Sequence, residues 1–545
     1  MRCSVLLLCC VCAVEARVEG FGRDTFVGNG VNQVLRHLER EGGALAATAG
    51  SNATTYFYNE AVVDHFGAEG AVQAQTFWSQ RYYVDETFWG GEGYPIFVYI
   101  GGEGPQGPPS LNLFMATLAQ EHGALMVAVE HRFYGASHPT RDMSNKNLRY
   151  LTSAQALADL ARITSYIKGQ SGPDAGADTA SAPPLKLSAS ARTSRVIGFG
   201  GSYPGDLAAW IRLKYPAVYD GTVASSAPVY AEYNYEQYAQ VVGAAMKYPL
   251  IGGSATCFNV AKAGAEALRA LVLSTSPMGT SDGIPAALMP CGAISNELDL
   301  SMYEQSVFGL FQGAVQYNLE GRPPYVSDVC TALVKPGATP LQRLADAAAL
   351  FANQSLPFKQ RCQLSSWQRD QIQPLKQRRF DNESSMRQWI WQSCNEFGFF
   401  QTTSGADHPF AAFKALGIEY AGRLICEQAY DLKGYKQPNT LWSNTNYGNR
   451  DLQATNVVTP NGNMDPWHAL GLVNKTDPFY NSCTSGPCPT QALAASDELV
   501  TLDGTAHCRD MYRPSVFADI GVPDTPSVVW AHAKIRAAVA RFLTN

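Results

Sequence analysis

Three residues that lie far apart in the sequence, Ser202, Asp465 and His507, are of the types that together perform nucleophilic catalysis. A serine hydroxyl is a weak nucleophile, and an imidazole within hydrogen-bond reach can take its proton and later return it to the leaving group. A carboxylate on the other ring nitrogen fixes the tautomer of the imidazole and stabilises its cation. The three side chains could therefore act together, provided that the fold brings them to one place.

Ser202 stands at an abrupt change of local pattern, in "VIGFGGSYPGDLAAW" (196–210). An apolar run ends on two glycines, and a helical pattern begins directly after the serine, which predicts a strand–turn–helix corner that exposes one hydroxyl. The usual pattern of such a corner is G-x-S-x-G, and here Pro204 takes the place of the second glycine, with Gly205 next. Proline is tolerated there, because the first helical turn has no acceptor for its missing N–H.

The same corner predicts where a developing oxyanion would be bound. The backbone N–H of Tyr203 lies at the start of the predicted helix, where N–H groups have no intrahelical acceptor. A second donor is expected from the loop "GGEGP" (101–105), and we assign it to Gly102.

Asp465 and His507 each follow a predicted buried strand, "NVVTPNG" and "LVTLDG" respectively. The carboxyl ends of parallel strands meet at one edge of a sheet, so both residues can converge there with Ser202. The chain order serine, aspartate, histidine is that of the α/β-hydrolases, and differs from the orders in chymotrypsin and subtilisin.

Other histidines are alternatives for the base. His468, three residues after Asp465, could serve instead, although its place on the following helix makes its geometry poorer. We interpret His131 as a structural residue, with Glu130 and Arg132 beside it forming an ion pair; Arg132 could also line the site.

The elements that must position these residues are six β-rich runs, most of them separated by helical patterns. The runs are apolar at consecutive positions, which is typical of strands buried on both faces of a mostly parallel sheet. The alternation with helices predicts an α/β fold. The runs span residues 94–105, 124–135, 194–205, 221–229, 454–467 and 497–508, and the helices 111–122, 153–168 and 206–215.

The middle of the chain has a different character. Helical patterns dominate residues 232–430, and six of the nine cysteines outside the N-terminal segment lie there. We interpret this stretch as a helical cap, stapled by disulfides and inserted between a first hydrolase segment (17–231) and a second one (431–545). An independent C-terminal domain is the alternative, and the return of β-rich runs after residue 454 argues against it.

The N-terminus predicts export. Arg2 precedes the apolar run "SVLLLCCVCAV", so residues 1–16 read as a secretory signal peptide. The secretory pathway oxidises thiols, which suits a chain with many cysteines. Four asparagines lie in N-x-S/T sequons and are candidate glycosylation sites, namely Asn52, Asn353, Asn382 and Asn474.

Composition and motifs argue against several other classes of protein. The net charge of −6 provides no basic footprint for nucleic acid. No stretch reaches the length of a membrane span. The sequence "GEGPQG" (102–107) matches a dinucleotide fingerprint, but nearby prolines oppose the helix that the motif requires. We therefore expect no cofactor and no metal.

Seven stretches together resemble the prolylcarboxypeptidase family of serine peptidases, and "SYPG" and "HCRDM" are more similar to its thymus-specific branch. The resemblance implies an α/β-hydrolase with a helical cap after the sixth strand, a triad of Ser202, Asp465 and His507, and cleavage after proline near a chain end. It also implies Trp467 in the substrate pocket. The stretches are "YIGGEGP", "EHRFYGAS", "GFGGSYPGDLAAW", "ASSAPV", "WQSCNEFGFFQT", "NGNMDPW" and "GTAHCRDM".

Two disulfides are expected. Cys394–Cys426 brackets the end of the cap, and the family places a bridge at similar spacing. Cys483–Cys488 would close the small loop "CTSGPC". The partner of Cys257 stays open, and Cys508, next to His507, is our candidate for an unpaired thiol.

The substrate would be a short peptide, with Tyr203 and residues 389–400 forming further walls of its pocket. Glu103 could pair with a free α-amine, whereas Arg132 or Arg509 could hold a free carboxylate. An esterase or lipase, or a non-catalytic binding module of the same fold, are the alternative functions. The expected location is the lysosome, the vacuole or the outside of the cell, and a homodimer is compatible with the sequence.

Overall fold

The computed structural model describes most of the chain beyond its first 51 residues. The predicted signal peptide and the Cys483–Cys488 loop lie outside the described part. The described residues are 52–67, 76–169, 185–320, 323–352, 362–381, 384–472, 498–518 and 521–544.

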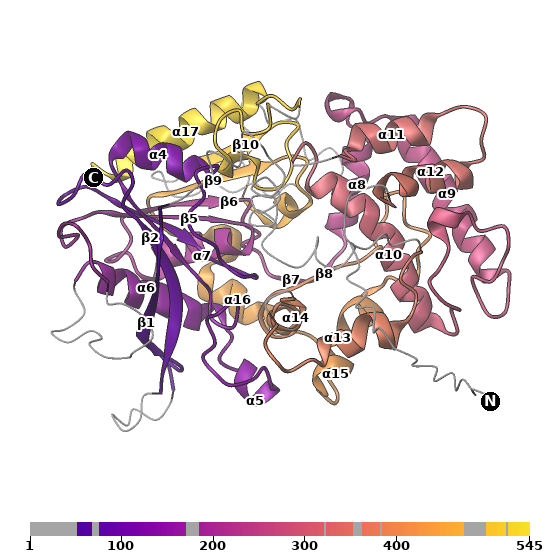
Figure 1. Ribbon diagram of the computed structural model, residues 1–545. Coiled ribbons are helices and arrows are strands. Elements are labelled where there is room, and N and C mark those ends of the chain that lie inside the picture. The colour runs from indigo at the N-terminus through magenta and orange to yellow at the C-terminus, as the bar shows by residue number, and fades with distance from the viewer. Residues whose placement is uncertain are drawn as a thin grey trace, which may run out of the picture.

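An eight-stranded, mostly parallel sheet forms the centre of one half of the molecule (Figure 1). Its strand order is β1-β2-β4-β3-β5-β6-β9-β10, and only the pairs β1–β2 and β2–β4 are antiparallel. All six predicted β-rich runs are strands of this sheet, whereas β1 and β2 were not predicted. The strands are β1 (Thr54–Val62), β2 (Phe77–Asp85), β3 (Ile96–Ile100), β4 (Leu125–Val129), β5 (Val196–Gly201), β6 (Gly221–Ser225), β9 (Val457–Gly462) and β10 (Glu498–Leu502).

Helices cover both faces of the sheet, as the consecutive apolar residues of its strands require. Alternate residues of β3 belong to different cores: Val98 packs with the residues of α6 and α7, and Phe97 with those of α4 and α17. This arrangement is the α/β-hydrolase fold. The covering helices are α4 (Phe114–His122), α6 (Ser153–Ile167), α7 (Tyr203–Lys214) and α17 (Pro526–Phe542), with the short α5 (Asn145–Leu148) in a loop.

The chain leaves the sheet after β6 and returns to it at β9, and the intervening elements form the second half of the molecule (Figure 1). They are mainly helical, with one parallel pair of strands, β7–β8, that was not predicted. We call them the cap. They are β7 (Glu232–Tyr235), α8 (Gln237–Lys247), α9 (Ala255–Leu273), α10 (Glu297–Gln316), α11 (Val326–Val334), α12 (Pro340–Ala352), α13 (Gln373–Leu375), α14 (Met386–Gln392), β8 (Gly398–Gln401), α15 (Leu424–Tyr430) and α16 (Thr440–Tyr447).

Three disulfides staple the cap. Cys394–Cys426 ties the chain after α14 to α15, as expected. Cys257–Cys330 joins α9 to α11, which gives Cys257 the partner that the sequence left open. The third bridge joins Cys291 to Cys362.

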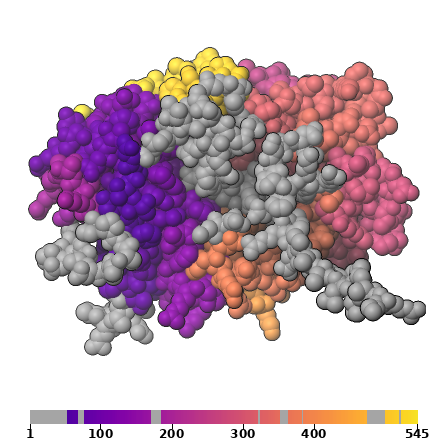
Figure 2. Space-filling view, viewed as in Figure 1, coloured from indigo at the N-terminus to yellow at the C-terminus, as the bar shows by residue number. Residues whose placement is uncertain are grey.

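The cap is anchored on the hydrolase half by polar and aromatic contacts. Glu396, which follows α14, accepts hydrogen bonds at the N-terminus of α6 from the backbone N–H of Ser153 (2.9 Å) and from its hydroxyl (2.9 Å). Trp210 of α7 stacks on Tyr447 of α16, with ring centroids 4.0 Å apart. Figure 2 shows the two halves side by side, with the C-terminal segment along the upper edge. The cap is therefore packed against α6 and α7, and α7 begins directly after Ser202.

Candidate active site

Ser202 occupies a strained corner between β5 and α7. Its backbone has φ 67° and ψ −136°, a region that non-glycine residues rarely adopt. The corner is fixed by a hydrogen bond from the Ser202 N–H to the carbonyl of Ser225 on β6 (3.0 Å). It also depends on glycine, because a Cβ on Gly200 would lie 2.0 Å from the carbonyl oxygen of Pro204. The turn between β5 and α7 thus holds Ser202 in a strained backbone conformation at the edge of the sheet.

Asp465 and His507 meet at the same edge of the sheet. The Nδ1 atom of His507 lies 2.8 Å from Oδ2 of Asp465, and both side chains are buried. Oδ1 of Asp465 accepts the backbone N–H of Trp467 at 2.9 Å, so both carboxylate oxygens are held. The Nε2 atom of His507 is buried and has no hydrogen-bond partner among the described residues. A proton on Nδ1 thus leaves Nε2 as an unoccupied acceptor.

His468 lies close to Asp465 but not on its carboxylate. Its Nδ1 lies 2.5 Å from the backbone carbonyl of Asp465, on the short helix Pro466–Leu470. Burial lowers its pKa. The structure thus brings His507, rather than His468, to the Asp465 carboxylate.

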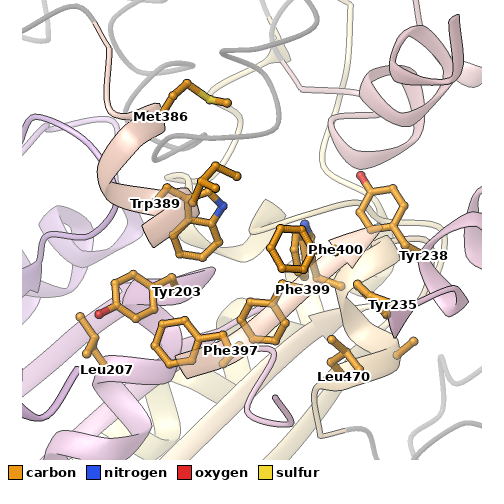
Figure 3. Packing of buried hydrophobic residues seen from close by; sticks show 14 of the residues in the cluster. Tyr203, Leu207, Tyr235, Tyr238, Met386, Trp389, Phe397, Phe399, Phe400 and Leu470 are labelled. Atoms are coloured by element: carbon orange, nitrogen blue, oxygen red, sulfur yellow. The ribbon is translucent and has the colours of Figure 1, made fainter. Parts of the chain in front are cut away.

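A small aromatic pocket opens at Ser202. Trp467 forms one wall, and its ring lies 5.5 Å from that of Phe399 and 5.4 Å from that of Tyr235. Figure 3 shows Tyr203 of α7 close to the cap residues Trp389, Phe397 and Phe399. The residues that line the pocket are Glu103, Ser202, Tyr203, Pro228, Gln316, Tyr317, Trp389, Phe399 and Trp467.

Glu103 is the charged side chain of this pocket. It is 4% exposed, and its Oε2 has no hydrogen-bond partner among the described residues. Burial raises the pKa of Glu103 to about 7, although a nearby backbone hydrogen bond and the charge of His507 act in the opposite direction. Its charge therefore changes near neutral pH.

The loop of Gly102 lies against the turn that carries Tyr203. Tyr203 is the first residue of α7, where a backbone N–H has no intrahelical acceptor. Gly102 approaches the same turn so closely that a Cβ on it would lie 2.3 Å from the Pro204 ring.

Arg132 corrects one expectation. It does not pair with Glu130 but with Asp159, through Nε at 2.6 Å and Nη2 at 2.7 Å, and it is fully buried. Glu130 pairs with Arg81 instead. Arg132 does not line the Ser202 pocket, because its guanidinium joins Asp159 of α6 to the end of β1.

Arg509 also fails to reach the pocket. Its guanidinium pairs with Asp524 at 2.9 Å and lies over the ring of Phe517. Neither arginine that the sequence offered as a holder of a substrate carboxylate is therefore in a position to do so.

Gln316 and Tyr317 are among the pocket residues that sequence reasoning missed. They end α10, and the backbone carbonyl of Gln316 accepts the N–H of His507 at 3.0 Å. No local motif marks them, since they reach the site only through the packing of the cap on the hydrolase half.

The remaining predicted residues lie as follows. Cys508 is a free, buried thiol. Asn52 is exposed, as a glycosylated residue must be. Asn353, Asn382 and Asn474 lie outside the described residues.

The described part of the chain holds neither a candidate metal cluster nor a candidate membrane span. No group of three or more His, Cys, Asp and Glu side chains there is arranged to hold a metal ion. None of its helices is both long and apolar enough to cross a membrane.

Comparison with known proteins identifies relatives over most of the chain. The model of the family described as serine carboxypeptidase S28 matches residues 61–520. A putative serine protease of Caenorhabditis elegans is 30% identical over 570 residues, covering 99% of this chain and 94% of the relative. Thymus-specific serine protease of Mus musculus is 32% identical over 475 residues, covering 84% and 82% respectively. Lysosomal Pro-X carboxypeptidase of Homo sapiens is 27% identical over 464 residues, covering 80% and 82%.

Proposed function

Since this chain belongs to the serine carboxypeptidase S28 family and is a serine peptidase, we propose that Ser202, Asp465 and His507 form its catalytic triad. We propose further that it cleaves short peptides on the carboxyl side of proline, near a chain end.

One observation carries the triad. His507 holds the Asp465 carboxylate through Nδ1, while its Nε2 is buried without a partner beside a pocket that Ser202 lines. A buried imidazole nitrogen without a partner is unfavourable unless something else uses it. We assign the Ser202 hydroxyl as the donor to Nε2 of His507. Catalytic hydrogen bonds of this kind often tighten only when substrate is bound.

The chemistry follows from these roles. The Ser202 oxygen attacks the carbonyl carbon of the scissile bond while its proton passes to Nε2 of His507. The carbonyl oxygen becomes an oxyanion, which the N–H groups of Tyr203 and Gly102 stabilise. His507 then gives the proton to the leaving amine, and an acyl-enzyme remains. Water attacks the acyl-enzyme by the same route in reverse and restores Ser202.

The pocket supports proline as the residue before the cleaved bond. Its walls are aromatic, and a proline ring is compact, apolar and conformationally fixed. Trp467 follows Asp465 by two residues, so one wall of the pocket is built into the triad itself. Contact of the substrate ring with the aromatic walls would distinguish proline from alanine by about 1–3 kcal/mol, or roughly 10–200-fold in kcat/KM. Alanine substrates should therefore be slow rather than inert.

Glu103 supports recognition of a chain terminus, since it is the ionisable acid in the pocket and neither Arg132 nor Arg509 reaches it. The ionised carboxylate can bind an α-ammonium group. The neutral acid can donate a hydrogen bond to an α-carboxylate. Both modes act on a peptide end rather than on an internal segment.

A panel of short peptides tests the proposal. One proline peptide is compared with its alanine counterpart, with forms blocked at the N-terminus, the C-terminus or both, and with acyl esters of similar size. We expect the proline peptide to be preferred and the doubly blocked form to be poor. Equal kcat/KM for all blocked forms would contradict end-on recognition, whereas esters turned over in the absence of peptide cleavage would favour an esterase or lipase. A protein that turns over none of them, and that no active-site reagent labels, would instead be a binding module.

The disulfides and the relatives support a location in the secretory pathway. The described chain holds three disulfides, and relatives include proteins named as lysosomal and as probably extracellular. We propose lysosomal, vacuolar or extracellular residence, with residues 1–16 as the signal peptide.

A further inference from the structure

The hydroxyl of Tyr203 has two partners from different parts of the molecule. The Nε2 of Gln392, the last residue of the cap helix α14, donates to it at 2.9 Å. The Nε2 of His131, in the loop after β4, lies 3.0 Å away. Gln392 in turn accepts the hydroxyl of Tyr134 at 2.5 Å. All four side chains are buried, so no solvent can replace a missing partner.

The protonation of His131 sets the direction of each hydrogen bond that links these four side chains. Nδ1 of His131 lies 2.8 Å from the backbone carbonyl of Arg132, which can only accept, so Nδ1 carries the proton. Burial lowers the pKa of His131 to about 4, so the ring is neutral and its Nε2 is an acceptor. Tyr203 must therefore donate to His131 and accept from Gln392. Gln392 then presents its oxygen to the hydroxyl of Tyr134.

The ring of Tyr203 is held by the same cap segment that supplies Gln392. Its centroid lies 5.7 Å from that of Trp389 on α14 and 5.4 Å from that of Phe397 (Figure 3). Since the backbone of Tyr203 is covalently continuous with the nucleophile, fixing both its ring and its hydroxyl fixes the direction of its backbone N–H.

We propose that Gln392 and His131 are positioning residues for the oxyanion hole, and that the cap completes the active site through the chain Tyr134–Gln392–Tyr203–His131. The proposal rests on the proposed function, in which the N–H of Tyr203 stabilises the oxyanion. Gln392 acts through Tyr203 and does not touch the reacting atoms. If the cap withdrew from the hydrolase half, Tyr203 would lose the hydrogen bond from Gln392. The geometry of the oxyanion hole would then be lost as well.

The substitution Gln392→Glu tests the polarity of the chain without changing its shape. The ionised carboxylate has no proton to donate, so Tyr203 would face two acceptors with one hydrogen. The neutral acid restores the original pattern, because its O–H can donate to Tyr203 while its other oxygen accepts from Tyr134. We expect kcat at pH 8.5 to fall at least about tenfold with KM within about twofold, since complete loss of an oxyanion donor lowers kcat by about 10²–10³. At pH 5 the ratio of kcat to that of the unmodified enzyme should return towards one.

The matched control is Gln388→Glu, one turn earlier on α14. Gln388 is also buried, and it donates to the carbonyl of Phe133 in the same loop (3.1 Å), but it has no contact with Tyr203 in the chain described above. Its kcat should stay within about twofold at both pH values. All rates are divided by the number of active sites titrated with a phosphonate, so that unfolded molecules do not count. Glu396 lies near Tyr203 and its pKa is raised by burial to about 7, so a new carboxyl at position 392 would couple to it. The substitution Tyr203→Phe adds no carboxyl and is therefore independent of this coupling.

The substitution Tyr203→Phe provides a second test. It keeps the backbone N–H but removes the hydroxyl, and should lower kcat at least about tenfold at both pH values. Adding Gln392→Glu to it should cause little further loss, because both changes break the same chain. The proposal is overturned if Gln392→Glu keeps the kcat of the unmodified enzyme at pH 8.5, if its loss is the same at both pH values, or, should that variant not fold, if Tyr203→Phe keeps the kcat of the unmodified enzyme. Failure of the proposed function would look different, since the unmodified enzyme would then not be labelled at Ser202.

Discussion

Glu103 faces the Ser202 pocket with a charge that depends on pH, because burial raises its pKa to about 7. Below this pH the neutral acid can donate to a substrate carboxylate. Above it, the carboxylate can bind an α-ammonium group, which itself stays protonated up to a pH of about 8. The pH of the compartment would thus decide which peptide end is bound.

Replacement of Glu103 by Gln should abolish this dependence. In the unmodified enzyme, kcat/KM for peptides with only a free carboxylate should fall as the pH rises through about 7, and kcat/KM for peptides with only a free amine should rise. In Glu103→Gln both transitions should disappear, because the amide stays neutral, and the free-carboxylate peptide should be cleaved at pH 8 as well as at pH 6. Persistence of the transition in the variant would assign it to another group.

Some site residues could be predicted from the sequence because their local context marks them. Ser202 lies on a glycine-rich corner, and Asp465 and His507 each follow a buried strand in the order that this fold requires. Gln316 and Gln392 could not be predicted, since neither belongs to a local motif and each acquires its role only when the cap packs on the sheet. Arg132 shows the opposite case: this residue beside a motif was left as a candidate for the site, but its charge is paired with a buried aspartate.

At the scale of the element, the elbow between β5 and α7 depends on the close approach of its own backbone. We predict that Gly200→Ala lowers both the free energy of unfolding and kcat, because the new Cβ would lie 2.0 Å from the backbone oxygen of Pro204. The cost should be about 1–3 kcal/mol or more, as for other overpacked sites. Urea unfolding and active-site titration measure the two effects.

Gly201→Ala is the matched comparison for this prediction. Its Cβ would lie 2.1 Å from Sδ of Met511 and 2.9 Å from Sγ of Cys508, both of which are side-chain atoms. A methionine side chain can move aside more cheaply than a backbone carbonyl. Equal damage from both variants would mean that the turn is not limited by its backbone.

The bridge Cys394–Cys426 fixes the segment that carries the cap side of the pocket. Removing it by Cys394→Ala with Cys426→Ala should cost about 3–4 kcal/mol by the loop-closure argument, for a sequence separation of 32. We expect KM to rise, because Trp389 and Phe399 flank Cys394 in the sequence and line the pocket. The control is removal of Cys257–Cys330, which joins α9 to α11 away from the pocket. It should lower the unfolding temperature but leave kcat/KM unchanged; a parallel change in both variants would contradict a local effect.

The six parallel strands could be predicted because burial on both faces leaves a continuous apolar run. β1 and β2 escaped prediction, since an antiparallel pair at the sheet edge mixes polar and exposed residues into the pattern. The helical pattern was predicted over residues 206–215, and α7 begins at Tyr203, with Pro204 in its first turn as the sequence indicated.

At the scale of the whole molecule, buried titratable groups predict how stability varies with pH. Burial raises the pKa of four carboxyl groups to about 7 and lowers that of three imidazoles to about 4. An acid whose pKa is raised by folding loses stability as the pH rises from its unfolded value to about 7; an imidazole whose pKa is lowered gains stability between about 4 and 6.5. The carboxyl groups are those of Glu103, Glu304, Glu396 and Asp510, and the imidazoles those of His131, His408 and His532.

Below about pH 6.5 the carboxyl groups and the imidazoles change the stability in opposite directions as the pH rises. Above about pH 6.5 only the carboxyl groups still change it. Burial also raises the pKa of Asp206 and Glu320 well above the ordinary range, which extends the same trend upward. We therefore predict that the unfolding temperature changes little between pH 5 and 6.5 and falls between pH 6.5 and 8. Calorimetry at constant ionic strength measures it. An unfolding temperature that rises between pH 6.5 and 8 would contradict this prediction. The predicted loss of stability above pH 6.5 suits a protein of an acidic compartment.

The central claim is that Ser202 is the nucleophile of a Ser202–His507–Asp465 triad, and labelling with a fluorophosphonate tests it most directly. The reagent requires a serine that is activated by a neighbouring base. Peptide mapping by mass spectrometry should find a single modified serine, Ser202, in the folded protein. Labelling should be absent in Ser202→Ala and strongly slowed in His507→Ala, although both variants remain folded. A label on a different serine, or equal labelling of His507→Ala, would contradict the triad.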